Sequence, residues 1–386
     1  MNLKLIIIFS VLFIPYNLIS QESFEFVIHD TLNTHGISTF TDSQDFIITV
    51  GVSGDSDSSE FYAMILKYTN ENDIQKKVFN KQDTVSLFKF GFLLSNGNYF
   101  LAGEIDDSEE YYRKNLYIAE IDQDLNIVYE KIYGIPTEYN NIWLYNLLLD
   151  ADSNVIINAE LNDSAPGNIK HHYFAKLNTQ GDTLVTSINT QLGCHPGSEL
   201  VQKPDKSGYY VIGGFFYSHM IKLDNDLNVT GWIQTVASNC YSGSLGAKFL
   251  SSGDLIIGSL AAQEVPGAFY DLRVRVCDTT LIPNRDTVIF DEGYNFLPLY
   301  SGLDFINENN IWVATYPQLG DSYSEWEYGR IYIFDANLNV KGAKYFGGST
   351  SLYLFSLKVL DDGGCIITGI TPDDGGKGYD DVFIKK

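Results

Sequence analysis

A short run of apolar residues recurs seven times along the chain, each time after a turn of Asp, Ser, Asn or Gly. Examples are "SNGNYFLAG" from Ser95 and "DGGCIITG" from Asp362. Such runs, bounded by turn residues, are typical of buried strands. The first apolar positions are Phe46, Tyr99, Val155, Tyr210, Leu255, Ile311 and Cys365, at intervals of 45 to 56 residues. This spacing predicts an internal repeat.

A second apolar run follows each first run, as in "YIAEIDQDLNIV" and "HMIKLDNDLNVT". The segments "DQDLN", "DNDLN" and "DANLN" predict hairpin turns, because Asp and Asn side chains bond their own backbone and tolerate left-handed angles. A short strand is expected after each turn. Another is expected before each first run, in segments such as "LFKFGFLL", "LGAKFL" and "LYLFSLKVL". Each repeat therefore contains four predicted strands.

Four strands in a unit of about 53 residues, without helical periodicity, are typical of a β-propeller blade. The sequence predicts an all-β fold: one domain over residues 21–386, a seven-bladed β-propeller of four-stranded antiparallel blades. The chain ends within the third strand of the last blade, and we expect the N-terminal "SFEFVI" to complete it, because an open ring would expose unpaired strand edges. A solenoid or a pair of β-sandwiches is the alternative, but the constant register favours the propeller.

The first 20 residues have the pattern of a signal peptide. Lys4 precedes the apolar run "LIIIFSVLFI", and Ser20 is a small residue suited to the cleavage site. The run is too short to span a bilayer comfortably. We expect an exported protein that is periplasmic, outer-membrane-associated or extracellular, without direct membrane insertion.

Composition and charge further narrow the class of protein and its partners. The chain is 45% hydrophobic and 14% aromatic, which excludes disorder and favours strands. Its formal net charge is −24. Nucleic acids and anionic membrane surfaces are therefore poor partners.

The loops between the second and third strands of each repeat are long, as in Glu104 to Asn115, and long loops on a rigid scaffold often carry binding sites. In blades six, seven, one and two, which would be consecutive around a closed ring, these loops are acidic and aromatic. This predicts a ligand face for a protein partner or a glycan. Ordinary solvated loops of an acidic protein are the alternative. The candidate binding residues are Tyr316, Tyr323, Trp326, Tyr328, Asp373, Asp374, Asp55, Asp57, Asp106, Asp107, Tyr111 and Tyr112.

Metal chemistry has weak support in the sequence. His171 and His172 are neighbours on a predicted strand, so they point to opposite faces and cannot share an ion. Asp55, Asp57 and Glu60 offer oxygen ligands for calcium but lack the pattern of the twelve-residue calcium loop. We therefore expect no cofactor, with calcium at this turn as the alternative.

The four cysteines fall into two groups. Cys194 and Cys240 occupy equivalent positions in adjacent repeats, and export permits oxidation, so they are candidates for a disulfide. Cys277 and Cys365 fall inside predicted strands, where a free thiol behaves as a small apolar residue. No catalytic residue is assigned, because the sequence has no phosphate loop, no GxSxG elbow and no recognisable nucleophile with its base.

The repeated "DGGCIITG", the "KLDNDLNV" type of hairpin and the "KYFGG" that closes a repeat carry a resemblance. They resemble the exported repeat propellers of gliding and gut bacteria, whose chains often end in a type 9 secretion sorting domain. The resemblance implies a propeller of the cell envelope or the secreted fraction. No sorting domain follows "DVFIKK", which favours a periplasmic or partner-tethered role.

The functional expectation from the sequence is a non-enzymatic binding or scaffold module. It would engage a protein partner through the acidic, aromatic loop face. The alternative is a propeller that binds or cleaves carbohydrate, with Trp326 and tyrosines as a flat platform. Cleavage would further require two carboxylates roughly 5 to 9.5 Å apart.

Overall fold

The computed structural model describes most of the chain, and every element in the described residues is a strand. Among the residues that the structure describes, no helix is long and apolar enough to cross a membrane. The predicted all-β class is confirmed. The described ranges are 25–28, 33–55, 60–70, 72–80, 84–106, 113–163, 170–190, 198–213, 218–235, 246–262, 270–289, 297–298, 300–316, 327–348, 352–372 and 380–386.

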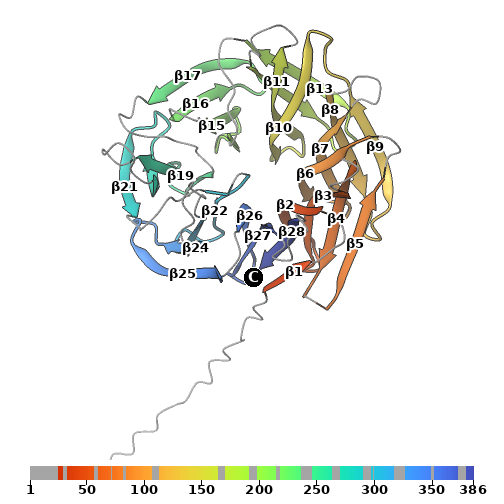
Figure 1. The fold of residues 1–386 in the computed structure, drawn as a ribbon. Coiled ribbons are helices and arrows are strands. Elements are labelled where there is room, and N and C mark those ends of the chain that lie inside the picture. The colour runs from red at the N-terminus through yellow and green to blue at the C-terminus, as the bar shows by residue number, and fades with distance from the viewer. Residues whose placement is uncertain are drawn as a thin grey trace, which may run out of the picture.

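Most strands join antiparallel sheets in chain order, and Figure 1 shows these sheets arranged around a common centre. One sheet holds β2 (Asn33–Thr41), β3 (Ile47–Asp55), β4 (Glu60–Tyr68) and β5 (Ile74–Phe79). Others hold β14 (Glu199–Gln202), β15 (Tyr209–Gly213), β16 (Ser218–Leu223) and β17 (Val229–Thr235); β18 (Ala247–Phe249), β19 (Leu255–Ala262), β20 (Tyr270–Cys277) and β21 (Pro283–Ile289); and β22 (Leu303–Asp304), β23 (Ile311–Thr315), β24 (Glu327–Phe334) and β25 (Val340–Gly348).

A longer sheet contains two four-strand sets, joined where Asn141 of β10 pairs in parallel with Lys114 of β8. The first set is β6 (Ser86–Leu93), β7 (Tyr99–Asp106), β8 (Lys114–Ile121) and β9 (Ile127–Tyr133). The second set is β10 (Tyr139–Leu149), β11 (Val155–Asp163), β12 (Lys170–Leu177) and β13 (Thr183–Asn189).

The two ends of the chain share a sheet. It holds β26 (Tyr353–Val359), β27 (Cys365–Pro372), β28 (Asp380–Lys385) and the N-terminal β1 (Glu25–Ile28). β1 pairs antiparallel with β28, with Val27 opposite Phe383. The predicted pairing of the N-terminal strand with the last repeat is therefore present.

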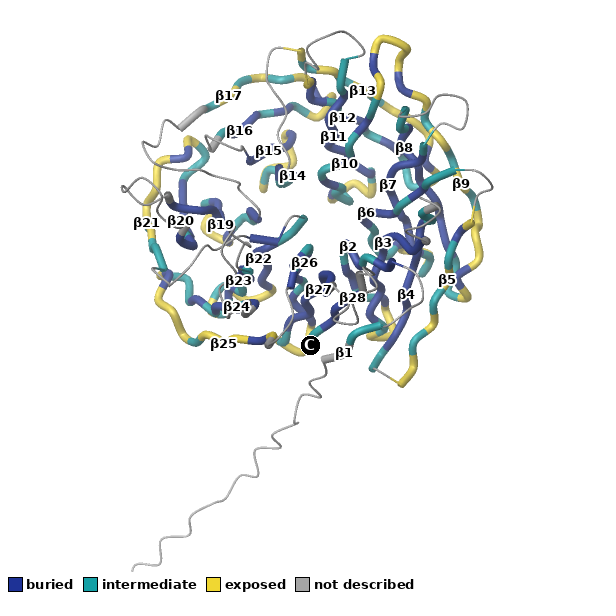
Figure 2. The backbone as a smooth tube through the Cα atoms, in the orientation of Figure 1, coloured by how far each residue is buried: buried dark blue, intermediate teal, exposed yellow. Residues whose placement is uncertain are grey.

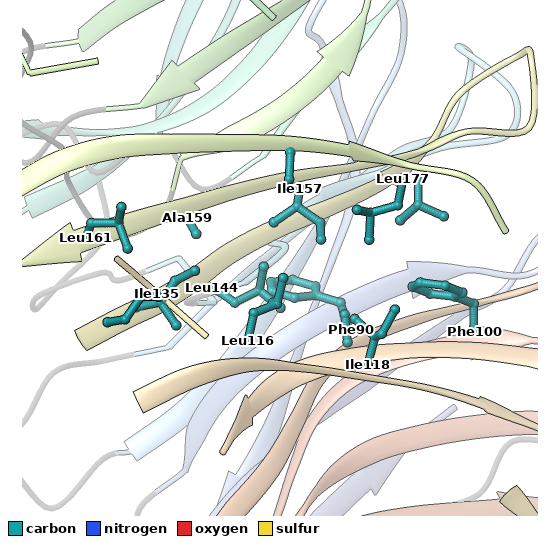
Figure 3. Packing of buried hydrophobic residues seen from close by; sticks show 14 of the residues in the cluster. Phe90, Phe100, Leu116, Ile118, Ile135, Leu144, Ile157, Ala159, Leu161 and Leu177 are labelled. Atoms are coloured by element: carbon teal, nitrogen blue, oxygen red, sulfur yellow. The ribbon is translucent and has the colours of Figure 1, made fainter. Parts of the chain in front are cut away.

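Apolar clusters lie between successive sheets and hold them together. One cluster joins β6–β8 to β10–β12, and Figure 3 shows Phe90, Ile118, Leu144 and Ile157 within this layer. Another joins strands from the two ends of the chain, with Ile366 and Val382 packed near Met64 and Leu66. Burial of these side chains supplies the main driving force for packing sheet on sheet.

Burial changes regularly from the centre of each sheet outward (Figure 2). The middle strands β7 and β8 are buried along almost their whole length, because sheets cover both of their faces. The outer strands β9 and β13 alternate between exposed and partly buried residues, because only one face is covered. This pattern explains why the two middle strands produced the clearest apolar runs in the sequence.

The predicted hairpin turns are present, but a different residue adopts the left-handed angle. In "DQDLN", Asp122 accepts hydrogen bonds from the backbone N–H groups of Asp124 and Asn126. Leu125 adopts φ of 61° and is only 4% exposed. The same arrangement recurs at Leu227, Leu281 and Leu338. A left-handed leucine is strained, and burial of its side chain offsets that cost.

Glycines recur in the second strand of several sheets where the backbone of the first strand lies very close. A Cβ added to Gly103 would lie 1.8 Å from the carbonyl oxygen of Leu87, and one on Gly369 would lie 2.1 Å from that of Tyr353. In both sheets the first strand has a β-bulge beside this contact. The repeat therefore keeps glycine where two strands approach too closely for a side chain.

Candidate functional site

A cavity of about 470 Å³ lies among the first strands of neighbouring sheets. β14, β18, β22 and β26 supply most of its lining. Figure 2 shows β14, β22 and β26 beside the open centre of the molecule. The lining includes four ionisable residues, one from each of these strands: Glu199, Lys248, Asp304 and Lys358.

Three of these charged residues occupy the same register position in their sheets. Each lies opposite the second residue of the following strand. The pairs are Lys248 with Ile256, Asp304 with Trp312, and Lys358 with Ile366. In four other sheet sets this position carries Phe40, Phe92, Leu148 and Val201. Among these seven strand sets, the residue at this register position is therefore charged only in the three neighbouring sheets that contain β18, β22 and β26.

Asp304 organises the charged group. Its Oδ1 lies 2.8 Å from the ammonium nitrogen of Lys248, and its Oδ2 lies 3.0 Å from that of Lys358. The backbone N–H of Phe305 donates to Oδ1 at 2.9 Å, and that of Val359 donates to Oδ2 at 3.0 Å. Each carboxylate oxygen thus has two partners. The aspartate is nearly buried, whereas both lysine side chains are 40% exposed.

Electrostatics set the protonation state of the two acids. Burial alone would raise the pKa of Asp304, but the ammonium groups of Lys358 and Lys248 and the hydrogen bonds to the carboxylate lower it. Burial raises the pKa of Glu199 to about 8, and the charge of Asp304 adds to this effect. A hydrogen bond from Asn146 and the two lysines oppose it. Asp304 is therefore ionised at neutral pH, while Glu199 is largely protonated.

A second charged cluster is buried between β6, β8 and β10. The ammonium nitrogen of Lys89 lies 2.5 Å from Oε1 of Glu104, and the backbone N–H of Leu144 donates to the same oxygen at 2.7 Å. Lys114 lies 3.6 Å from Oε2. Both lysines also lie over the ring of Trp143, at 5.3 and 4.3 Å from its centroid. This cluster ties two strand sets together and has a structural role.

Two of the candidate binding residues, Tyr316 and Asp106, are described with their side chains. Tyr316 is partly buried, packs against an apolar cluster and makes an edge contact with Tyr353. Burial raises its pKa to about 12. Asp106 ends β7 opposite Lys114, and burial raises its pKa above the usual value. The structure thus places Tyr316 in a packing layer between sheets.

Several predicted loop positions belong to strands. Glu104 is a buried residue of β7, Asp55 ends β3, and Tyr328 lies in β24. The strands extend further than expected because their ends still pair with neighbouring strands. The remaining candidates lie outside the described residues: Asp57, Asp107, Tyr111, Tyr112, Tyr323, Trp326, Asp373, Asp374, and the proposed disulfide pair Cys194 and Cys240.

Histidine and cysteine positions agree with the sequence interpretation. His171 lies 2.9 Å from an oxygen of Asp163, whereas His172 stacks on Phe174. Cys277 and Cys365 are buried free thiols, as predicted. Across the described part of the chain, no group of three His, Cys, Asp or Glu residues is placed to hold a metal ion. The calcium candidate includes Asp57, which is not described.

Sequence reasoning missed the central charged residues. The expected inner strands "LGAKFL" and "LYLFSLKVL" already contained Lys248 and Lys358. A comparison of equivalent inner-strand positions would have found charge where other repeats carry apolar side chains.

No protein-family model matches the chain, and no curated protein matches its sequence. Solved structures do share its fold. An acylaminoacyl peptidase of Pyrococcus horikoshii aligns with 91% of this chain and 51% of its own, at 8% identity and a TM-score of 0.51. A puromycin hydrolase aligns with 88% of this chain and 58% of its own, at 11% identity and a TM-score of 0.51. A protein of unknown function from Dyadobacter fermentans aligns with 95% of this chain and 98% of its own, at 8% identity and a TM-score of 0.53.

These comparisons support the class of a β-propeller-like all-β protein. The chain spans about half the length of the acylaminoacyl peptidase. Solved chains that match number 305, so the fold is widely shared and does not by itself select a function.

The functional expectation from the sequence needs correction. We expected a non-enzymatic scaffold that engages a protein through its loop face. Two of the similar solved structures are a peptidase and a hydrolase, which contradicts the expectation of a non-enzymatic scaffold. At 8 and 11% identity, the similarity shows the fold alone.

Proposed function

We propose that this chain is a peptidase-related propeller that receives peptides in its central cavity. The observation that carries the proposal is the cavity of about 470 Å³ with its mixed lining. This volume lies within the usual range of small-molecule sites, roughly 300 to 1,000 Å³. The similarity to an acylaminoacyl peptidase supports a peptide ligand but concerns fold alone.

The lining matches the chemistry of a short peptide. Lys248, Asp304 and Lys358 provide charge, while Leu148 and Phe249 provide apolar surface. Peptides combine charged ends, polar amides and apolar side chains. Ligand sites commonly combine an apolar lining with a few placed polar groups.

Peptide binding can be tested by fluorescence anisotropy. The protein from residue 21 onward is titrated against a fluorescein-labelled hexapeptide of Gly, Ala and Leu. Ser301→Phe should abolish binding by filling the cavity, because Ser301 is part of the lining. Thr183→Phe on the exposed outer strand β13 is the matched control and should bind normally. Equal binding by both variants, or none by the parent protein, would refute the proposal.

We also propose that the sheets are the seven blades of a closed ring, with β1 as the outer strand of the last blade. The pairing of β1 with β28, and the cluster that joins β27 and β28 to β3 and β4, support this closure. Deletion through Ile28 should lower the urea midpoint and promote aggregation, because it exposes the edge of β28. An unchanged midpoint would contradict closure.

We further propose that residues 1–20 direct export and that residues 21–386 form a single domain.

A further inference from the structure

With Glu199 protonated, the ionisable residues of the cavity carry a local excess of positive charge. Lys248 and Lys358 bring two ammonium groups to the single carboxylate of Asp304. The chain as a whole carries a formal net charge of −24, so this excess opposes the overall charge. A positive site with low-dielectric walls attracts an anion.

The donors and acceptors also favour an anionic ligand. Each oxygen of Asp304 already accepts from one backbone N–H and contacts one ammonium group. Lys248 additionally donates to the carbonyl oxygen of Phe305. An ammonium group has three donors, so these contacts within the described residues leave one donor on Lys248 and two on Lys358. The cavity therefore offers donors to a ligand, while its aspartate is fully engaged.

We propose that Lys248 and Lys358 bind the C-terminal carboxylate of a peptide in the central cavity, with Asp304 as the residue that positions both ammonium groups. This inference rests on the proposed function and specifies which end of the peptide is recognised. The apolar liners Phe249, Leu200 and Leu303 would surround the terminal side chain. That lining suits an organic carboxylate better than a free inorganic anion.

Glu199 adds a dependence on pH. It faces Asn146 of β10, Lys248 of β18, Asp304 of β22 and Lys358 of β26. When it is protonated, the four ionisable groups have a net charge of +1; when it is ionised, they are neutral. Because its pKa is raised to about 8, the affinity for a carboxylate should fall as the pH rises through this value.

The test compares two forms of one N-terminally labelled hexapeptide, ending in a free carboxylate or in a carboxamide. The free acid is expected to bind at least 10-fold more tightly at pH 7. Lys358→Met and Lys248→Met should each remove this preference, and Lys358→Arg should retain it. Lys344→Met on the exposed strand β25 is the matched control. Circular dichroism establishes that each variant is folded.

The outcomes separate this inference from the proposed function. Equal binding of acid and amide would leave peptide binding intact and overturn carboxylate recognition. Absence of binding by both peptides would overturn both proposals. Competition distinguishes the source of the anion: displacement by inorganic phosphate at concentrations where acetate has no effect would assign a phosphate site and refute the carboxylate.

Discussion

Replacement of Asp304 by alanine offers a sharp test of the central cluster, because one carboxylate joins three neighbouring sheets. Its oxygens accept from the backbone N–H groups of Phe305 and Val359, and both donors belong to buried residues. Leaving each donor unpaired costs about 1–3 kcal/mol. The ion pairs with Lys248 and Lys358 add little, about 0–1 kcal/mol each, because both lysines are partly exposed. The expected loss is about 2–8 kcal/mol of unfolding free energy, most of it from the two unpaired N–H groups.

Urea unfolding followed by tryptophan fluorescence measures this loss. Trp312 of β23 lies opposite Asp304 in the register, so it reports on the same sheet. Asp361→Ala, in an exposed turn, is the matched control and should change stability by less than about 0.5 kcal/mol. A loss below about 1 kcal/mol for Asp304→Ala would refute the assigned role, because two unpaired buried N–H groups should together cost at least about 2 kcal/mol.

The acid dependence provides an independent check of the same residue. The pKa of Asp304 is lowered in the folded protein, whereas an unfolded aspartate titrates near 3.9. Its contribution is therefore complete above about pH 4 and is lost as the pH falls through the lower folded value. The stability difference between the parent protein and Asp304→Ala should shrink as the pH approaches 3. A constant difference would contradict the ionised state.

Further predictions concern the other buried titratable groups. Glu104→Gln leaves Lys89 buried without its charge partner and should cost about 3–5 kcal/mol in urea unfolding; Lys89→Met added to this variant should recover much of the loss, and an equally unstable double variant would contradict the pairing. Burial raises the pKa of Glu199 to about 8, so unfolding free energy should decline from pH 5 to 8 more steeply in the parent than in Glu199→Gln, and parallel profiles would count against it. Burial raises the pKa of Cys277 to about 11 and that of Cys365 to about 12. In a variant with Cys194→Ser and Cys240→Ser, neither remaining thiol should react with a colorimetric thiol reagent at pH 8 until urea is added, and prompt reaction of the folded variant would contradict their burial.

Local sequence patterns predicted the strands well. Five of the seven second strands begin at the residue inferred from the repeat, and β3 and β15 begin one residue away. The success has a local cause: a middle strand is covered on both faces, so its apolar run is continuous and bounded by turn residues. Hairpin positions were also correct. The left-handed leucines, as at Leu125, were missed because their angle depends on burial against a neighbouring sheet.

The candidate site was predicted poorly, for a physical reason. Lys248, Asp304 and Lys358 are more than 50 residues apart in succession, and each is an unremarkable charge within its own segment. These three residues meet only because they occupy the same register position in three sheets that pack side by side. Long acidic loops gave a stronger local signal, yet Glu104 proved to be a buried strand residue.

The amino-acid sequence determined the repeat, the all-β class, the turn positions and the pairing of the N-terminal strand with the last repeat. These features depend on local periodicity and on the need to cover strand edges. The tertiary structure alone decided which charges meet. Asp304 can hold both Lys248 and Lys358 because packing of neighbouring sheets brings their first strands together around the centre. A contact between distant residues depends on that packing, and the local pattern of each strand does not contain it.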